Sequence, residues 1–249
     1  MQFSQTPPWS DTPLPPGWTP NPAPANFFGG GGGSEISAWG RVAVNGKVST
    51  AVAKTQVYVL DAGVGNHVDL NVMQRVNPSC STNGTNCIGL PSIGWYPHGT
   101  HVAGIIGAKD SGVGVRGVNA GAPIFSVSVA DAQDTANVCA YVLAGALLSS
   151  ILSGLDWIKA NVVATFPYRV AVVNMSISGS SVSRTNPTLS GVPFPQKGNG
   201  TIYNNYGRLS GTSMAAPHIA GVAAWLAETY NPSSADALET LVRSYIVAG

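Results

Sequence analysis

The chain has 249 residues, a formal net charge of +1 and only 9% charged residues. Its length suits one α/β domain with a sizeable core, or at most two small ones. Because the charge is near zero and no basic run occurs, we expect no nucleic-acid or acidic-lipid partner. The low charged fraction, together with 30 Gly and 18 Pro, is typical of a compact, loop-rich and often extracellular protein.

The first segment, residues 1–34, is rich in Pro and ends in a run of glycines, Gly29 to Gly33. Pro stiffens a chain and poly-Gly loosens it, so we interpret 1–34 as a tail or linker and 35–249 as the folded domain. The tail is either the remnant of a longer precursor or an end with no role. Its first 28 residues carry no positive or apolar region of the kind that forms a signal peptide.

The three cysteines differ in their surroundings. Cys80 and Cys87 lie in a polar, turn-rich loop, which predicts a disulfide and therefore an oxidising compartment. A metal site is the alternative, although no nearby His or third Cys completes a ligand set. Cys139 lies among apolar residues, which favours a buried free thiol. Since Asp69 and Asp131 are isolated and no carboxylates cluster, we assign no metal site.

Short β-branched runs alternate with longer apolar stretches along the chain. This pattern predicts strands at 56–60, 124–129 and 170–177, and helices at 98–108, 138–158 and 213–230. The stretch 138–158 is interrupted by serines and Asp156, so a buried helix is favoured over a membrane span. The alternation indicates a layered α/β fold with a mostly parallel sheet, whose sites gather beyond the carboxyl ends of the strands. Asp61 lies at one of those ends.

Three motifs carry polar residues that suit catalysis, and each is ambiguous by itself. Asp61 precedes a small-Gly turn, where an Asp commonly only caps the turn. His98 and His101 lie three apart and could ligate zinc, but no HExxH pattern accompanies them. Ser213 opens an apolar helix, where a Ser is commonly an N-cap or first-turn residue.

Taken together, in the order Asp, His, Ser, the motifs resemble the subtilisin family of serine peptidases, the subtilases. The most specific segments are HGTHVAG at 98–104 and GTSMAAPH at 211–218, and the resemblance covers about 56–230. It implies a three-layer α/β/α fold and a secreted, monomeric serine endopeptidase that acts on proteins or peptides. No membrane partner and no cofactor are implied. Subtilisin-like enzymes often bind calcium in loops, so a structural ion is compatible with the resemblance, without an assigned site.

The resemblance also implies a role for each residue of the triad. Ser213 is the nucleophile, His98 is its general base and later the acid, and Asp61 orients the imidazole. The backbone amide of Ser213 and the start of its helix lie where the oxyanion develops. Pro217 removes a hydrogen bond at about the fifth position of this helix, a local rule broken near a functional site.

Other residues take lesser roles by the same resemblance. The segment Ser176, Ile177, Ser178 and Gly179 matches the strand that pairs with substrate backbone, with Ser178 in place of the usual Gly. His101 and His218 are implied to be structural, and Met214 to be a site of oxidative inactivation.

The chain departs from the family in one interval. Ser213 follows Gly179 by only 34 positions, and the Asn that completes the oxyanion hole in subtilisins has no clear counterpart. The nearest superficial match, 198–200, follows no apolar run. We therefore expect a fold truncated before the serine helix, with an unknown side-chain donor for the oxyanion. Three hypotheses remain: a peptidase, active or weakened; a dead binding protein on the same fold; and an esterase on another fold, which here lacks a Gly-x-Ser-x-Gly elbow.

Overall fold

The computed structural model describes residues 35, 37–49, 55–78, 97–112, 114–129, 148–162, 170–177, 190–193, 206–209 and 212–248. The strands are β1 Lys47–Val48, β2 Thr55–Asp61, β3 Asn71–Val76, β4 Asn119–Ala120, β5 Pro123–Ser128, β6 Val170–Asn174, β7 Ser190–Pro193 and β8 Tyr206–Leu209. The helices are α1 Trp39–Ala43, α2 Pro97–Gly107, α3 Leu148–Asn161, α4 Thr212–Tyr230 and α5 Ala235–Ala248. The tail 1–34 and all three cysteines lie outside the described residues.

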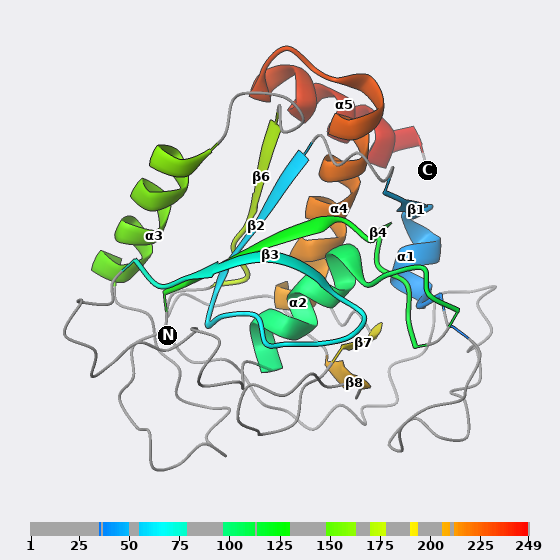
Figure 1. Cartoon of the computed structure of the whole chain (residues 1–249). Coiled ribbons are helices and arrows are strands. Elements are labelled where there is room, and N and C mark those ends of the chain that lie inside the picture. The colour runs from blue at the N-terminus through cyan, green and yellow to red at the C-terminus, as the bar shows by residue number, and fades with distance from the viewer. Residues whose placement is uncertain are drawn as a thin grey trace.

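Four strands form the main sheet, in the order β3-β5-β2-β6 (Figure 1). All three pairings are parallel, as the sequence predicts. The central strand β2 pairs with β5 on one side and with β6 on the other, where Val59 lies opposite Asn174. Since the strands are parallel, their carboxyl ends meet at one edge, and Asp61 is the last residue of β2.

The sheet is covered by helices on both faces, which explains why every residue of β2 is buried. Val57 and Val59 belong to a core cluster with residues of α2 and α4, such as Val102 and Leu226. The alternate residues of β2, Tyr58 and Leu60, belong to a second cluster with Ile151 and Ile158 of α3. The sheet therefore lies between α3 on one face and α2 with α4 on the other, the expected α/β/α arrangement (Figure 1).

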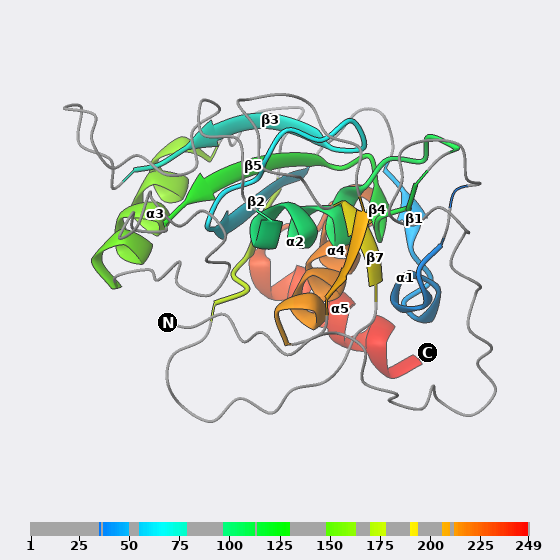
Figure 2. The same cartoon turned by 90° about the horizontal axis from the view of Figure 1, so that it is seen from below.

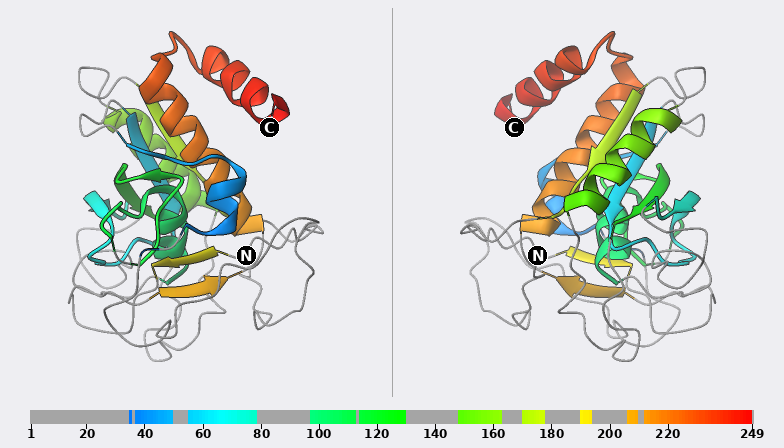
Figure 3. Two further views of the ribbon diagram at one scale, coloured as in Figure 1. Left: turned by 90° about the vertical axis from the view of Figure 1, so that its right-hand side faces the viewer. Right: turned by 90° about the vertical axis from the view of Figure 1, so that its left-hand side faces the viewer.

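The helices on the second face pack on one another as well as on the sheet. Figure 2 shows α2 and α4 side by side, and the antiparallel hairpin β7–β8 lies next to α2. The last helix, α5, packs beside α4 and away from the sheet (Figure 3). Both α2 and α4 begin near the carboxyl edge of the sheet, so the first residues of the two helices lie close to the ends of β2 and β6.

The predicted elements agree with the observed ones in kind, and they differ in length. Within the described residues the helix predicted at 138–158 runs over Leu148–Asn161, and the strand predicted at 170–177 ends at Asn174, the last residue paired with β2. The short elements α1, β1 and β4, the strand β3, the hairpin β7–β8 and the helix α5 had no prediction. No helix in the described part of the chain is long and apolar enough to cross a membrane.

Candidate active site

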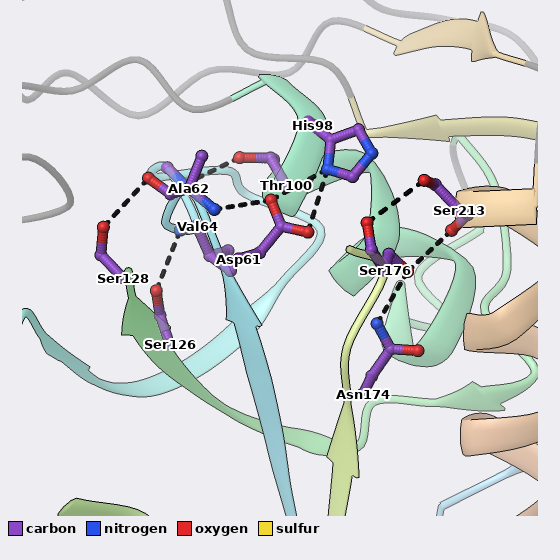
Figure 4. A network of polar contacts seen from close by, with 11 residues as sticks. Asp61, Ala62, Val64, His98, Thr100, Ser126, Ser128, Asn174, Ser176 and Ser213 are labelled. Carbon is purple, nitrogen blue, oxygen red and sulfur yellow. Dashed lines mark hydrogen bonds and ion pairs between the residues drawn. The ribbon is translucent and has the colours of Figure 1, made fainter. Parts of the chain in front are cut away.

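Asp61 and His98 form the polar pair at the carboxyl end of β2 (Figure 4). The Nδ1 atom of His98 lies 2.9 Å from each carboxylate oxygen of Asp61. The carboxylate is buried, whereas the imidazole side chain keeps 17% of its exposure. Because a carboxylate accepts, Nδ1 carries the proton, which leaves Nε2 of the neutral ring as an acceptor.

Two glycines allow α2 to approach the end of β2 this closely. Gly63 has a φ of 111°, a conformation that turns the chain back after Asp61 and that side chains resist. A Cβ on Gly99 would overlap the carbonyl oxygen of Gly63 and lie 3.0 Å from Oδ1 of Asp61. Only glycine at position 99 therefore lets the neighbouring His98 reach the carboxylate.

Hydroxyl side chains fasten the loop that follows Asp61. The amide of Gly65 donates to Oγ1 of Thr100 at 2.8 Å, which ties the loop to α2. On the other side, Ser126 accepts from the amide of Val64, and Ser128 donates to the carbonyl of Ala62 (Figure 4). The loop is thus held between β5 and α2, and with it the carboxylate of Asp61.

Ser213 is the second residue of α4 and lies beside the end of β6. Its Oγ donates to the carbonyl of Ser176 at 3.2 Å, and the hydroxyl of Ser176 donates in return to the carbonyl of Ser213 at 2.9 Å. The side-chain amide of Asn174 donates to Oγ of Ser176 at 2.9 Å. In the view of Figure 4 the His98 ring has Asp61 on one side and Ser213 on the other, with its second nitrogen turned to the serine side.

The structure thus brings Asp61 to His98, and Ser176 to Ser213, at one edge of the sheet. Of the predicted substrate strand, Ser176 is buried and Ile177 packs against the α3 side of the core. Ser178 and Gly179 lie outside the described residues, as do Cys80, Cys87, residues 198–200 and Asp131. The predicted Cys80–Cys87 disulfide therefore stays a prediction, and the side-chain donor of the oxyanion hole stays unassigned.

Two residues that support the site, Thr100 and Asn174, had no prediction from the sequence. Thr100 lies inside the HGTHVAG segment, but its partner Gly65 is 35 positions away. Asn174 ends a strand, and its contact with Ser176 spans the turn into the predicted substrate segment. The sequence signal for the contact with Ser176 is Pro217, because a proline at this position leaves the carbonyl of Ser213 without its helix donor.

Two further histidines, His101 and His218, and one isolated acid, Asp69, are buried in the packing. His101 is fully buried in α2. His218 is buried in α4, and burial lowers its pKa, an effect that a bond between Nδ1 and the Met214 carbonyl partly offsets. Asp69, isolated in sequence, is buried and accepts from the hydroxyl of Ser111. Among the residues that the structure describes, no three His, Cys, Asp or Glu side chains gather as a metal site would require.

Comparison with known proteins gives a consistent family. The model of the Subtilase family matches residues 53–203 and 195–247. A thermostable alkaline protease of Halalkalibacterium halodurans is 26% identical over 235 residues, which cover 70% of this chain and 57% of that protein. M-protease of Shouchella clausii is 31% identical over 229 residues, covering 72% and 55%. Subtilisin Savinase of Lederbergia lenta is 30% identical over 229 residues, covering 72% and 77%.

Solved structures agree on the fold. A cold adapted subtilisin-like serine proteinase superposes with a TM-score of 0.53 at 21% identity, covering 79% of this chain and 84% of that one. Proteases from Pseudoalteromonas arctica superpose with a TM-score of 0.52 at 21% identity, covering 78% and 84%. This chain spans little more than half the length of the thermostable alkaline protease. From the family match and the shared fold, the chain belongs to the subtilase family.

Proposed function

We propose that this chain is a serine endopeptidase that hydrolyses peptide bonds through Asp61, His98 and Ser213. The observation that carries the proposal is the 2.9 Å contact between Nδ1 of His98 and the buried carboxylate of Asp61, at the sheet edge where α4 begins. A carboxylate on Nδ1 holds the tautomer in which Nε2 can take a proton from a serine hydroxyl. The relatives named as proteases support the same reaction.

In the first half of the reaction Oγ of Ser213 attacks the carbonyl carbon of the scissile peptide bond. Its proton passes to Nε2 of His98, and Asp61 stabilises the imidazolium that forms. The intermediate collapses as the carbon–nitrogen bond breaks, and the proton on Nε2 goes to the leaving amine. Before the attack the Ser213 hydroxyl must turn to His98 from the Ser176 carbonyl, which is its acceptor in the resting structure.

In the second half water attacks the acyl group on Ser213, with His98 again as the base, and the carboxylic acid leaves. Each tetrahedral intermediate carries an oxyanion that needs hydrogen-bond donors. The backbone amide of Ser213, in the first turn of α4, is one donor in this proposal, since amides at a helix start have no intrahelical partner. The second donor, a side chain in subtilisins, is unassigned.

The substrate class follows from the segment after β6. In this proposal Ser176, Ile177, Ser178 and Gly179 pair with an extended substrate through backbone hydrogen bonds. Backbone pairing recognises a peptide main chain rather than one small molecule, so proteins and peptides are the substrates. The proposal includes action as a monomer outside the cytosol, where a Cys80–Cys87 disulfide would be stable.

A second candidate is a subtilase that binds peptides and cleaves them slowly or not at all. One observation favours it: Ser213 follows Gly179 by only 34 positions, an interval too short for the usual oxyanion segment. Loss of the side-chain donor alone lowers turnover by about 10²–10³-fold in subtilisin. The two candidates therefore differ in rate and share the same binding segment.

A fluorophosphonate probe, which bonds covalently to an activated serine, separates the candidates. We expect the purified full chain to be labelled, and the label to be lost in Ser213→Ala. Cleavage of an unfolded protein substrate, measured beside hydrolysis of a small ester, then distinguishes a peptidase from an esterase. A folded chain that takes no label would overturn the proposal in favour of the binding protein.

A further inference from the structure

The inference begins with a backbone carbonyl that the helix cannot satisfy. In an α-helix the amide of residue i donates to the carbonyl of residue i−4, so the carbonyl of Ser213 awaits the amide of residue 217. That residue is Pro217, which lies inside α4 and has no amide hydrogen. The carbonyl of the proposed nucleophile therefore needs a donor from outside its helix, or it remains unsatisfied at considerable cost.

Ser176 supplies that donor. Its hydroxyl donates to the Ser213 carbonyl at 2.9 Å, the same atom that a helix amide would reach in the absence of Pro217. Its own carbonyl accepts from Oγ of Ser213 at 3.2 Å. Two opposed hydrogen bonds thus connect the end of β6 to the first turn of α4, one to the backbone and one to the hydroxyl of Ser213.

Asn174 fixes the direction of the Ser176 hydroxyl. Its side-chain amide donates to Oγ of Ser176 at 2.9 Å, so that oxygen receives one hydrogen and sends its own to Ser213. Both Asn174 and Ser176 are nearly inaccessible, at 2% and 4% exposure, so water does not compete for these bonds. Consecutive hydrogen bonds in such surroundings strengthen one another.

We propose that Asn174 is a positioning residue: through the Ser176 hydroxyl it replaces the helix hydrogen bond that Pro217 removes, and so sets where the Ser213 hydroxyl stands. The inference rests on the proposed function, because it concerns the same nucleophile. Asn174 touches no reacting atom. It acts on the first turn of α4, and small displacements of a reacting group have large effects on rate.

The test is a cycle of variants at Ser176 and Pro217. Ser176→Ala removes the donor and is expected to slow fluorophosphonate labelling of Ser213 about tenfold, since one buried carbonyl loses its partner. In a Pro217→Ala background, residue 217 regains an amide that can reach the same carbonyl. There, Ser176→Ala is expected to slow labelling by less than about threefold. A serine that merely filled space would slow labelling equally in both backgrounds.

Asn174→Ala is expected to slow labelling about as much as Ser176→Ala, and to lower kcat for a peptide substrate with little change in KM. Matched controls are Ser150→Ala and Asn119→Ala, a buried serine in α3 and a buried asparagine in β4, whose loss removes similar polar groups elsewhere. The controls are expected to label at nearly the wild-type rate. An equal slowing in the controls would overturn the positioning role.

Failure of the inference and failure of the proposed function give different results. A wild-type chain that is labelled at Ser213, with equal effects of Ser176→Ala in both backgrounds, overturns the inference and leaves the peptidase standing. A wild-type chain that takes no label overturns the peptidase. The same cycle measured by thermal unfolding then decides the inference. Equal Tm losses from Ser176→Ala in the two backgrounds overturn it, and a smaller loss with Pro217→Ala supports it.

Discussion

Two histidines on two helices of the same core face have different neighbours. His98 at the start of α2 meets a buried carboxylate, 2.9 Å from Nδ1, and keeps part of its side chain exposed. His218 inside α4 is 4% exposed, and its Nδ1 lies 2.7 Å from the Met214 carbonyl. A Cβ on Gly40 would overlap Nε2 of His218, so α1 closes off that side of the ring.

The difference shows that the partner and the surroundings decide what a histidine can do. A carboxylate stabilises the charged ring, which suits a base that must hold a proton for part of a reaction. Burial favours the neutral ring and lowers the pKa of His218, and the hydrogen bond to the Met214 carbonyl offsets this only in part. Both side chains lie within motifs of the family, yet only His98 has surroundings suited to proton transfer.

The largest effect is expected when the carboxylate is replaced. In Asp61→Asn the side chain keeps its shape and loses the charge that holds the proton on Nδ1 of His98. We expect kcat to fall by roughly 10⁴-fold, because the imidazole then takes the tautomer that cannot accept the serine proton. The control is His218→Asn, which keeps a donor near the Met214 carbonyl and is expected to stay within tenfold of wild type. Similar losses in the two variants would contradict the assignment of roles.

A methyl group placed beside each histidine gives a smaller effect that sharpens the comparison. Gly99→Ala must push α2 away from Gly63 and Asp61, so we expect a loss of about 10²-fold in kcat. Gly40→Ala crowds the His218 ring and is expected to cost about 1–3 kcal/mol of unfolding free energy with little effect on kcat. Urea unfolding and peptide hydrolysis of both variants check this. A Gly40→Ala variant with the larger kcat loss would refute it.

Local pattern was sufficient to predict the type of β2, β5, β6, α2, α3 and α4, whereas the site residues were predicted from the resemblance to the family. The near-continuous apolar run at 170–177 predicted a strand covered on both faces. In the structure β2 is buried on both faces, whereas β6 lies at the edge of the described sheet and leaves Val173 exposed. The strand β3 was missed because its sequence, NVMQRV, shows neither a continuous apolar run nor a strict alternation of apolar and polar residues. Helix α5 follows α4 closely and packs on it, and no motif lies in it.

The supporting contacts of the site could not be predicted, for a physical reason. Hydrogen bonds such as Thr100 to Gly65 and Ser176 to Ser213 join residues 35 and 37 positions apart. Sequence periodicity does not predict such pairs, because it does not distinguish the hydroxyl that meets a distant partner from any other hydroxyl on the same element. These hydrogen bonds can be identified only when the arrangement of β2, β6 and the first turns of α2 and α4 is known.

A still smaller effect is expected from the contact that ties the loop after Asp61 to α2. Thr100→Val removes the acceptor of the Gly65 amide and keeps the shape of the side chain. We expect a loss of about 1–3 kcal/mol of unfolding free energy, because a buried amide is left without its partner. The loss in kcat should be smaller than in Gly99→Ala, since the Asp61–His98 contact stays in place. Thr100→Ser, which restores the hydroxyl, is the control and should recover most of the stability.

The smallest effect is a change in how stability depends on pH. Burial lowers the pKa of His218 in the folded chain, so between that value and the unfolded value of about 6.5 the unfolded chain binds more protons. The free energy of unfolding must then rise with pH across this window, and the contribution of His218 is lost as the pH falls through it. We expect His218→Asn to flatten the slope just below the unfolded pKa of about 6.5. Urea unfolding in a Ser213→Ala background, where the chain cannot digest itself, measures both slopes. Equal slopes would mean that His218 titrates alike in the folded and unfolded chains, and the contrast with His98 would then rest on geometry alone.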